Sequence, residues 1–384
     1  MKNKIIYFDN AATSYFKPKV VLKSFVKFLK RSANPGRSGH KLSLKNSFKI
    51  WQTREIIAKH FGNIESEKVI FTKNCTEALN IAILGTVKEG GHVIASCFEH
   101  NSVLRPLHHL EQQGKIRLTI LQPKNKKFIT CDDIIKHITQ KTYLICVCSQ
   151  SNVTGTKNDF FNIGKLCKEK NILFLVDNAQ GAGHLNIDMK KCNISFLTFS
   201  GHKGFLTPQG IGALCINNCF SPLPIMFGGT GSNSNNLSQP SNLPDLLESG
   251  TLQTQLIASL YEGIKYVEKN LNKINRKTKE ICKYLFLNLK KLEGINIYGF
   301  TNFDSGIIAF NYKNYDSTDI SDYLDKKYNI AVRGGLHCAP LTHKFLNTEK
   351  QGIVRISLSF KNTKKEIRTL IKAIKNFETI KKLT

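Results

Sequence analysis

Two apolar segments in the middle of the chain, each ending in polar residues, constrain the fold more than any other feature. Residues 173–176 read Leu-Phe-Leu-Val and end on Asp177, and residues 194–199 read Ile-Ser-Phe-Leu-Thr-Phe and end on Ser200. A short, nearly continuous apolar run is typical of a strand buried in a parallel sheet. Ligands of open α/β sheets bind at the carboxyl ends of the strands. The two segments therefore predict an α/β fold with a ligand site beside Asp177.

A single lysine, Lys203, follows the second segment in the sequence Ser-Gly-His-Lys-Gly. A carboxylate and a lysine at neighbouring strand ends are the two groups that pyridoxal phosphate (PLP) requires. The lysine bonds covalently to the cofactor, and the carboxylate keeps the pyridine nitrogen protonated so that the ring withdraws electrons. The alternative is two ordinary buried strands that end in solvated loops. The pair, in this order, favours PLP, with Lys203 as a catalytic residue and Asp177 as the partner of the ring nitrogen.

The chain resembles the class V, fold-type I PLP enzymes of the cysteine desulfurase and selenocysteine lyase group. The resemblance covers nearly the whole chain, and it implies a PLP-dependent transferase fold with a mainly parallel seven-stranded sheet in a large domain and a smaller C-terminal α/β domain. We place the large domain at residues 13–260 and the small domain at residues 261–384, with residues 1–12 packing beside it. Besides the two segments above, the resemblance rests on the motifs Tyr7-Phe-Asp-Asn-Ala-Ala-Thr13, Asn34-Pro-Gly-Arg37, Cys75-Thr-Glu77, Glu99-His-Asn-Ser102, Ser151-Asn-Val-Thr-Gly-Thr156, Glu248-Ser-Gly-Thr251, Arg333-Gly-Gly-Leu-His-Cys338 and Val354-Arg-Ile-Ser357.

The resemblance also implies roles for residues around the cofactor. The phosphate is expected at Thr76, Ser200 and His202, and at Thr251 of a neighbouring subunit, which makes the site a property of a homodimer. Thr76 opens a helical pattern, and the N-terminus of a helix favours a dianion. The other expected contacts come from His100, also expected to be catalytic and stacked on the pyridine ring, from Gln180 at the phenolic oxygen, and from Cys75, Asn152 and Asp177.

Arg355 is the predicted site for the substrate carboxylate, with Asn152 and Arg333 beside it. The alternation in Ile-Val-Arg-Ile-Ser-Leu, residues 353–358, puts Arg355 on the opposite face from Val354. Its guanidinium matches the two oxygens of a carboxylate. The alternative reading is a surface salt bridge on an edge strand.

Cys338 lies in a short loop flanked by glycines and is the predicted nucleophile. Its thiolate would be favoured by a nearby cation, either Arg333 or a protonated His337. The loop resembles the persulfide-forming loop of the second, short-loop group of cysteine desulfurases, although Leu336 stands where many relatives carry a second histidine. The alternative is that Cys338 is one unremarkable thiol among eleven cysteines.

The expected reaction is conversion of L-cysteine to L-alanine, with the sulfur passing to Cys338 as a persulfide and then to an acceptor protein. A selenocysteine lyase, or another class V lyase or aminotransferase, is the alternative among enzymes. The sequence leaves open whether the sulfur serves iron–sulfur cluster assembly, tRNA thiolation or selenium supply.

The chain is strongly basic, with 56 Lys and Arg against 28 Asp and Glu and a formal net charge of +28. Such a charge can indicate a nucleic-acid or acidic-protein partner. However, Lys, Asn, Ile and Phe are all abundant together, as in proteins from AT-rich genomes, and the lysines are scattered rather than interleaved with aromatic residues. We therefore expect no nucleic-acid partner. A basic scaffold or RNA-binding protein that retains the fold is the alternative outside enzymes.

Composition also predicts the cellular setting. No apolar run reaches the roughly 18 residues of a membrane span, and the acidic residue at Asp9 comes too early for a secretory signal. Eleven cysteines without a regular framework fit the reducing cytoplasm. The pairs Cys146/Cys148 and Cys215/Cys219 lack histidine or cysteine partners at zinc-site spacing, so no metal site is predicted.

The apolar periodicity predicts the order of elements. Helices are expected from Pro18, over residues 44–61, over a helix-rich segment from 252 to about 291, and after a capping box at Thr363-Lys-Lys-Glu366. Residues 228–240, rich in Gly, Ser and Asn, predict a loop. Strands are predicted at 69–71, 93–96, 118–121, 143–147, 172–176, 196–199, 307–312 and 354–358.

Overall fold

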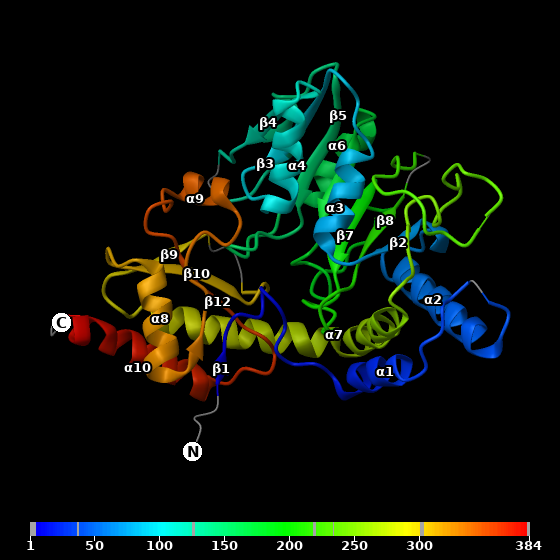
Figure 1. Cartoon of the computed structure of the whole chain (residues 1–384). Coiled ribbons are helices and arrows are strands. Elements are labelled where there is room, and N and C mark those ends of the chain that lie inside the picture. The colour runs from blue at the N-terminus through cyan, green and yellow to red at the C-terminus, as the bar shows by residue number, and fades with distance from the viewer. Residues whose placement is uncertain are drawn as a thin grey trace.

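The computed structural model describes residues 5–36, 38–124, 127–217, 220–232, 234–299 and 303–381. Arg37 of one predicted motif and Cys219 of the rejected metal pair lie outside these residues. The chain forms a larger part around a seven-stranded sheet and a smaller part around a three-stranded sheet, which lie side by side in Figure 1. Both termini lie at the smaller part.

The seven-stranded sheet contains all six strands predicted for this region and one more. Its strand order is β2-β8-β7-β6-β5-β3-β4, and β8 runs antiparallel to both neighbours while the other pairs are parallel. The strands are β2 (Val69–Thr72), β3 (Gly91–Ser96), β4 (Ile116–Leu121), β5 (Thr142–Cys148), β6 (Leu173–Asp177), β7 (Phe196–Ser200) and β8 (Gly212–Ile216). Because β6 and β7 are hydrogen-bonded neighbours, Asp177 and Ser200 end at the same edge of the sheet.

Both faces of this sheet are buried, which explains the continuous apolar runs. Val176 and Phe199 belong to one hydrophobic core, while Leu175 and Phe196, on the same two strands, belong to another. Helices and one 3-10 turn complete the larger part: α1 (Lys19–Leu29), α2 (Lys41–His60), η1 (Ser66–Lys68), α3 (Cys75–Leu84), α4 (Asn101–Gln112), α5 (Cys131–Ile135) and α6 (Phe160–Glu169). The layered α/β architecture that the sequence predicts is confirmed.

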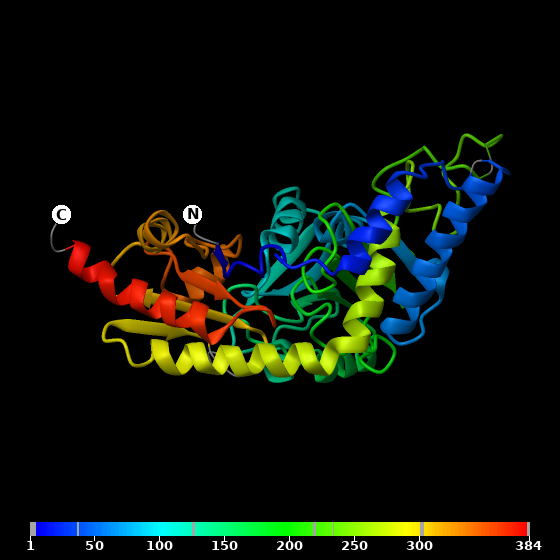
Figure 2. The same ribbon diagram turned by 90° about the horizontal axis from the view of Figure 1, so that it is seen from below.

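The helix-rich segment after residue 251 is one helix, α7 (Thr254–Leu289), of 36 residues. Figure 2 shows that it bends: one part packs against α1 and α2, and the other runs along the smaller part. Its buried residues up to Ile274 join the core of the larger part, and those from Ile281 onward join the core of the smaller part. The helix passes through residue 260 without interruption, so the division of the chain into two domains there stays a prediction.

The smaller part is a three-stranded antiparallel sheet, ordered β12-β10-β9, with helices against it. The capping box predicted at its last helix is present, since Thr363 Oγ1 accepts from the Glu366 amide at 3.2 Å and the Glu366 carboxylate accepts from the Thr363 amide at 2.8 Å. Its elements are β9 (Ile295–Tyr298), β10 (Ile307–Tyr312), α8 (Ser317–Tyr328), β11 (Ile330–Ala331), α9 (Pro340–Leu346), β12 (Val354–Ser357) and α10 (Lys364–Lys381).

The N-terminal segment returns to the smaller part. Strand β1 (Ile6–Tyr7) pairs in parallel with β11, Phe8 is fully buried in the core of the smaller part, and Asp9 forms a bridge with Ser357. This return carries Asp9 to the edge where β12 presents Arg355, so residues far apart in sequence meet at the site.

Candidate active site

A cavity of about 250 Å³ opens at the carboxyl edge of the seven-stranded sheet, between the two parts of the molecule. Nine of the ten residues predicted to bind the cofactor line it, and so do both predicted substrate-binding arginines. Its walls are Ala11, Ala12, Asn74, Cys75, Thr76, Leu79, Phe98, His100, Ser102, Cys148, Gln150, Asn152, Asp177, Ala179, Gln180, Ser200, His202, Lys203, Arg333 and Arg355. One cavity thus brings together strand ends, a helix N-terminus and residues of the smaller part.

Asp177, the last residue of β6, is held from two sides. Its Oδ1 accepts a hydrogen bond from the Ala179 amide at 2.8 Å and lies 3.5 Å from the Sγ of Cys75. The Cys75 thiol also lies 3.3 Å from Thr198 Oγ1. Burial and the neighbouring Asp177 charge raise the pKa of Cys75 well above its ordinary value, so Cys75 is a neutral thiol that can donate to the carboxylate. With Oδ1 so engaged, the carboxylate is fixed in orientation.

Lys203 lies in the loop after β7, deep in the protein and facing the cavity. Burial lowers its pKa below the ordinary lysine value, while the nearby charge of Asp177 acts in the opposite direction. The uncharged amine is therefore more populated than in an exposed lysine. An uncharged lysine amine is the form that reacts with an aldehyde and that accepts a proton.

Hydroxyl groups and a helix N-terminus gather at another side of the cavity. Cys75 and Thr76 are the first two residues of α3, and Ser200 Oγ accepts from the Cys75 amide at 3.0 Å. Thr76 Oγ1 lies 2.8 Å from Ser102 Oγ. His202 lines the same cavity, and burial, with Lys203 next in effect, lowers its pKa to about 4, which makes it a neutral imidazole. The donor set suits an anion such as a phosphate.

His100 caps helix α4, because its Nδ1 accepts from the Ser102 amide at 3.0 Å. Burial lowers the pKa of His100, so the ring is neutral with its proton on Nε2. Gln180 lies on the cavity wall and donates through Nε2 to the carbonyl oxygen of Ala11 at 3.0 Å. That His100 stacks on the cofactor ring and that Gln180 reaches its phenolic oxygen stay predictions.

Arg355 is almost completely buried, with 1% of its surface exposed, so it is not a surface residue of its edge strand. Its NH1 donates to the carbonyl oxygen of Asn152 at 2.9 Å and its NH2 pairs with Asp9 Oδ1 at 2.7 Å. Its Nε has no hydrogen-bond partner among the described residues. A buried guanidinium with an unused donor beside the cavity is what a substrate carboxylate needs.

Cys338 lies in the loop between β11 and α9, where its backbone has the unusual φ of 57°. Arg333 NH2 lies 3.4 Å from the Cys338 Sγ, so the cation proposed for this thiol is at hand. The sequence also suggested a protonated His337 as this cation. That prediction is wrong, because burial lowers the pKa of His337 well below its ordinary value and the ring is neutral. The Cys338 carbonyl accepts from the Asn101 amide at 2.7 Å, which joins the loop to the start of α4.

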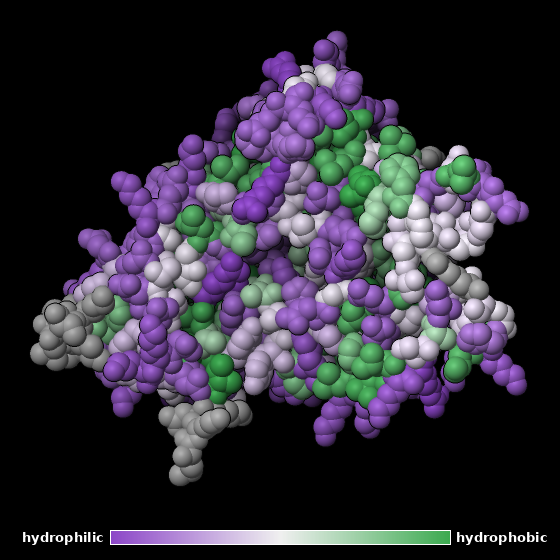
Figure 3. Space-filling view, in the orientation of Figure 1, coloured by the Kyte–Doolittle hydropathy of each residue, from purple (hydrophilic) through white to green (hydrophobic). Residues whose placement is uncertain are grey.

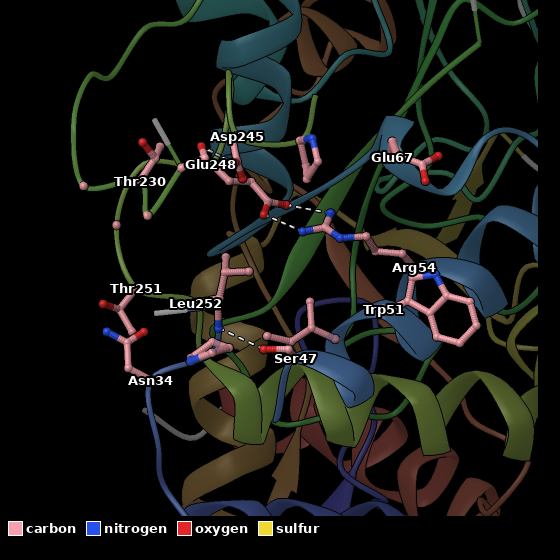
Figure 4. Close-up of a pocket in the computed structure, with 18 of the residues that line it drawn as sticks. Asn34, Ser47, Trp51, Arg54, Glu67, Thr230, Asp245, Glu248, Thr251 and Leu252 are labelled. Atoms are coloured by element: carbon pink, nitrogen blue, oxygen red, sulfur yellow. Dashed lines mark hydrogen bonds and ion pairs between the residues drawn. The ribbon is translucent and has the colours of Figure 1, made fainter. Parts of the chain in front are cut away.

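Thr251 does not line this cavity. It lies in a second pocket of about 410 Å³, beside α2 and residues 229–232. There the guanidinium of Arg54 forms two hydrogen bonds to the carboxylate of Glu248, at 2.9 and 2.5 Å (Figure 4). The place of Thr251 agrees with a residue that reaches another subunit, and that role stays a prediction.

The sequence predicted no role for two residues of the site, Asp9 and Glu99. Asp9 pairs with Arg355 across 346 residues of sequence, and no local pattern signals that contact. Glu99 is fully buried, and its Oε1 accepts from the Cys148 amide at 2.8 Å and from the Ser96 hydroxyl. Its position directly before His100, in the motif of residues 99–102, was a signal in the sequence that it lies at the site. Both residues fix the walls of the cavity.

The residues present fit PLP. The cavity combines a lysine of lowered pKa, a carboxylate in fixed orientation, and a neutral His202 whose Nδ1 has no partner among the described residues. Lys203 would hold the aldehyde carbon, Asp177 the ring nitrogen, and Thr76, Ser200 and His202 the phosphate.

Comparison with known proteins agrees with this site. The aminotransferase class-V family model matches residues 6–370. A probable cysteine desulfurase of Borreliella burgdorferi is 37% identical over 99% of this chain and 93% of its own length, and one of Pyrococcus abyssi is 34% identical over 97% and 94%. An apo structure of a cysteine desulfurase from Thermococcus onnurineus NA1 has a TM-score of 0.89 and 32% identity, covering 97% of this chain and 94% of that one.

The chain therefore belongs to the aminotransferase class-V family of PLP enzymes. Within that family it belongs to the cysteine desulfurases. The fold, the PLP dependence and the enzyme class predicted from the sequence are confirmed.

Proposed function

We propose that this protein takes sulfur from L-cysteine onto Cys338 as a persulfide, releases L-alanine and passes the sulfur to an acceptor protein. The observation that carries the proposal is the placement of the Cys338 thiol 3.4 Å from the Arg333 guanidinium, which itself lines the PLP cavity. A cation at that distance favours the thiolate, which is the nucleophilic form of cysteine.

The residues of the cavity divide the chemistry among them. When bound, PLP supplies an electron sink for the charge that develops at the substrate Cα. Arg355 binds the substrate carboxylate, and Asp177 holds a proton at the pyridine nitrogen. Lys203 accepts the Cα proton at Nζ, for which its lowered pKa suits it.

Cys338 carries the sulfur-transfer step. Its Sγ thiolate attacks the sulfur of L-cysteine, so that an S–S bond forms and the Cβ–S bond of the substrate breaks. The electron pair of the broken bond goes to Cβ, which takes up the proton that the substrate thiol loses, and Lys203 returns the Cα proton. The products are L-alanine and the Cys338 persulfide. The short loop that carries Cys338, residues 332–339 between β11 and α9, supports assignment to the short-loop group.

A second copy of the chain is the proposed partner at the pocket that contains Thr251. Figure 3 shows green patches among hydrophilic residues over α1. Exposed apolar side chains lie on α1, on α2 and on the segment after β8 that leads to this pocket. They are Val20, Leu22, Val26, Leu29, Leu42, Leu44, Phe48, Trp51, Leu223, Ile225, Met226, Phe227 and Leu237. Apolar residues on this scale indicate a protein interface. We infer a homodimer in which Thr251 serves the phosphate site of the other subunit.

The sulfur acceptor is expected to dock over the Cys338 loop, where Leu336 is exposed. The net charge of +28 favours encounter with an acidic protein. The ten described cysteines are free thiols, which fits the cytoplasm that the composition predicts. Across the described part of the chain, no helix combines the length and apolarity of a membrane span.

Replacement of Cys338 by serine tests the proposal. Cys338→Ser should keep PLP bound, because the cofactor contacts are untouched, and should lose sulfur release from L-cysteine by at least about a thousandfold, or about 4 kcal/mol of transition-state stabilisation. Cys131→Ser, at a partly exposed cysteine far from the cavity, is the matched control and should keep wild-type turnover. Wild-type sulfur release by Cys338→Ser would instead support direct elimination, as in a lyase.

A further inference from the structure

Behind the Cys338 loop lies a row of three buried polar side chains, Thr348, His343 and His337. Their exposed fractions are 2%, 0% and 2%. His343 belongs to α9, His337 precedes Cys338 in the loop, and the two imidazoles are parallel, with an interplanar angle of 9° and centroids 5.6 Å apart. Polar side chains buried this completely are found in proteins where hydrogen bonds compensate for their lost contacts with water.

One assignment of donors and acceptors satisfies all the hydrogen bonds of this row. His337 Nε2 lies 3.2 Å from the carbonyl oxygen of Arg333, which can only accept, so Nε2 carries the proton. Burial lowers the pKa of both histidines, that of His343 to about 4, so both rings are neutral. His337 Nδ1 therefore accepts from His343 Nε2 at 3.5 Å, and His343 Nδ1 accepts from Thr348 Oγ1 at 2.9 Å. In this assignment the row is a directed chain in which every ring nitrogen is used.

Arg333 and Asn152 contact His337 at the end of this row, and both belong to the proposed site. The Arg333 backbone exchanges two hydrogen bonds with Arg355, at 3.2 and 2.8 Å, and its guanidinium contacts the Cys338 thiol. The His337 carbonyl accepts from Asn152 Nδ2 at 2.8 Å. His337 and Cys338 both have positive φ, 53° and 57°, a conformation that costs side-chain-bearing residues free energy and persists only where the surroundings enforce it.

We propose that His343, through His337 and with Thr348 behind it, is a positioning residue that holds the Cys338 loop in its reactive conformation. This inference rests on the proposed function of Cys338. His343 touches neither cofactor nor substrate in this arrangement. It fixes the ring of His337, and His337 fixes the Arg333 carbonyl and the strained turn that holds the Cys338 thiol beside the Arg333 guanidinium.

The test compares variants that remove or retain the hydrogen bonds. His343→Phe keeps an aromatic ring against His337 but leaves its Nδ1 without a donor, whereas His343→Gln keeps a donor. Amide hydrogen exchange followed by mass spectrometry should show faster exchange in the peptide that contains residues 333–340 for His343→Phe and wild-type exchange for His343→Gln. Peptides from β6 should exchange as in the wild type in both variants, which shows that the fold is intact.

Turnover separates positioning from general stability. For His343→Phe, kcat with L-cysteine should fall about tenfold, equivalent to about 1.4 kcal/mol, with KM changed by less than about twofold because Arg355 still binds the carboxylate. If His343→Phe speeds amide exchange throughout the protein, Thr348→Val becomes the deciding variant, because it removes only the hydroxyl group. Thr348→Ser keeps a hydroxyl group and should behave as the wild type. Unchanged loop exchange and kcat in either His343→Phe or Thr348→Val would overturn the proposal. Faster loop exchange together with a fully active Cys338→Ser would refute the role of Cys338 instead.

Discussion

At the scale of single residues, the site is set by what burial does to ionisable groups. Desolvation pushes Lys203, His202 and His337 toward their neutral forms, whereas the guanidinium groups of Arg333 and Arg355 lie next to the Cys338 thiol and the Asp9 carboxylate. A buried base and a nearby fixed cation serve the two halves of the proposed reaction, proton transfer and thiolate attack. The residue types could be predicted from the sequence. Their protonation states could not, because they depend on how deeply each side chain is buried in the folded protein.

Glu99 gives this scale a pH-dependent prediction. Burial, with the charge of Asp177 in support, raises its pKa from 4.5 to about 8. Between these values the folded protein holds a proton that the unfolded chain has lost, so the free energy of unfolding should fall as the pH rises through this window. Glu99→Gln keeps an acceptor for Ser96 and the Cys148 amide but cannot ionise. Urea unfolding across the window should therefore show a shallower decline for Glu99→Gln, and identical slopes would contradict this assignment.

At the scale of elements, the sequence predicted strands where runs of large apolar residues are continuous, and it failed where the run opens with small residues or is partly solvated. Strands β6 and β7 were identified because both faces are buried. Strand β8 was missed because it opens with Gly212 and Ala213, whose small side chains give a weak apolar signal, and β9 because its residues are only partly buried. Nine of the ten residues predicted to bind the cofactor line one cavity, because they lie at strand ends or at the start of a helix, and their roles stay predictions. The Asp9–Arg355 pair and the His337–His343 row could not be found, since they depend on long-range packing.

The ion pair between α2 and the segment that ends at Thr251 leads to a prediction about stability at the scale of elements. The side chains of Arg54 and Glu248 are 9% and 4% exposed, and Glu248 also accepts from the Phe71 amide at 2.6 Å. Arg54→Met should leave a buried carboxylate unpaired and lower the free energy of unfolding by about 3–5 kcal/mol. Lys59→Met, at an exposed position of the same helix, should change it by less than about 0.5 kcal/mol. Equal midpoints in urea for both variants would show that the pair contributes little.

At the scale of the whole molecule, the smaller part supplies the proposed nucleophile and the proposed substrate arginine, while the larger part supplies the residues proposed to hold the cofactor. Helix α7 and the N-terminal segment join the two parts, so the cavity between them is built from both cores. The exposed apolar residues on α1 and α2 lie on the larger part, away from Cys338, which leaves the loop of the nucleophile open to an acceptor.

The proposed dimer is testable at this scale. Trp51 is 49% exposed on α2 beside the pocket of Thr251, and Trp51→Glu places a charge in the inferred interface. Sedimentation velocity should give a dimer for the wild type and a monomer for Trp51→Glu, whose affinity for PLP should also be lower because Thr251 no longer reaches the phosphate of the other subunit. Phe161→Glu, at a 53% exposed position on α6, is the control and should stay dimeric. A wild-type protein that sediments as a monomer with PLP fully bound would exclude this arrangement.

The central claim is that Cys338 receives the sulfur of L-cysteine, and mass spectrometry tests it most directly. The PLP-loaded protein is incubated with L-cysteine without an acceptor, and each cysteine-containing peptide is examined for the added mass of one sulfur atom. The account predicts that the peptide with Cys338 gains one sulfur while alanine appears in equal amount, and that the peptides of the buried cysteines stay unchanged. Alanine formation with no sulfur on Cys338, or sulfur on another cysteine, would contradict it.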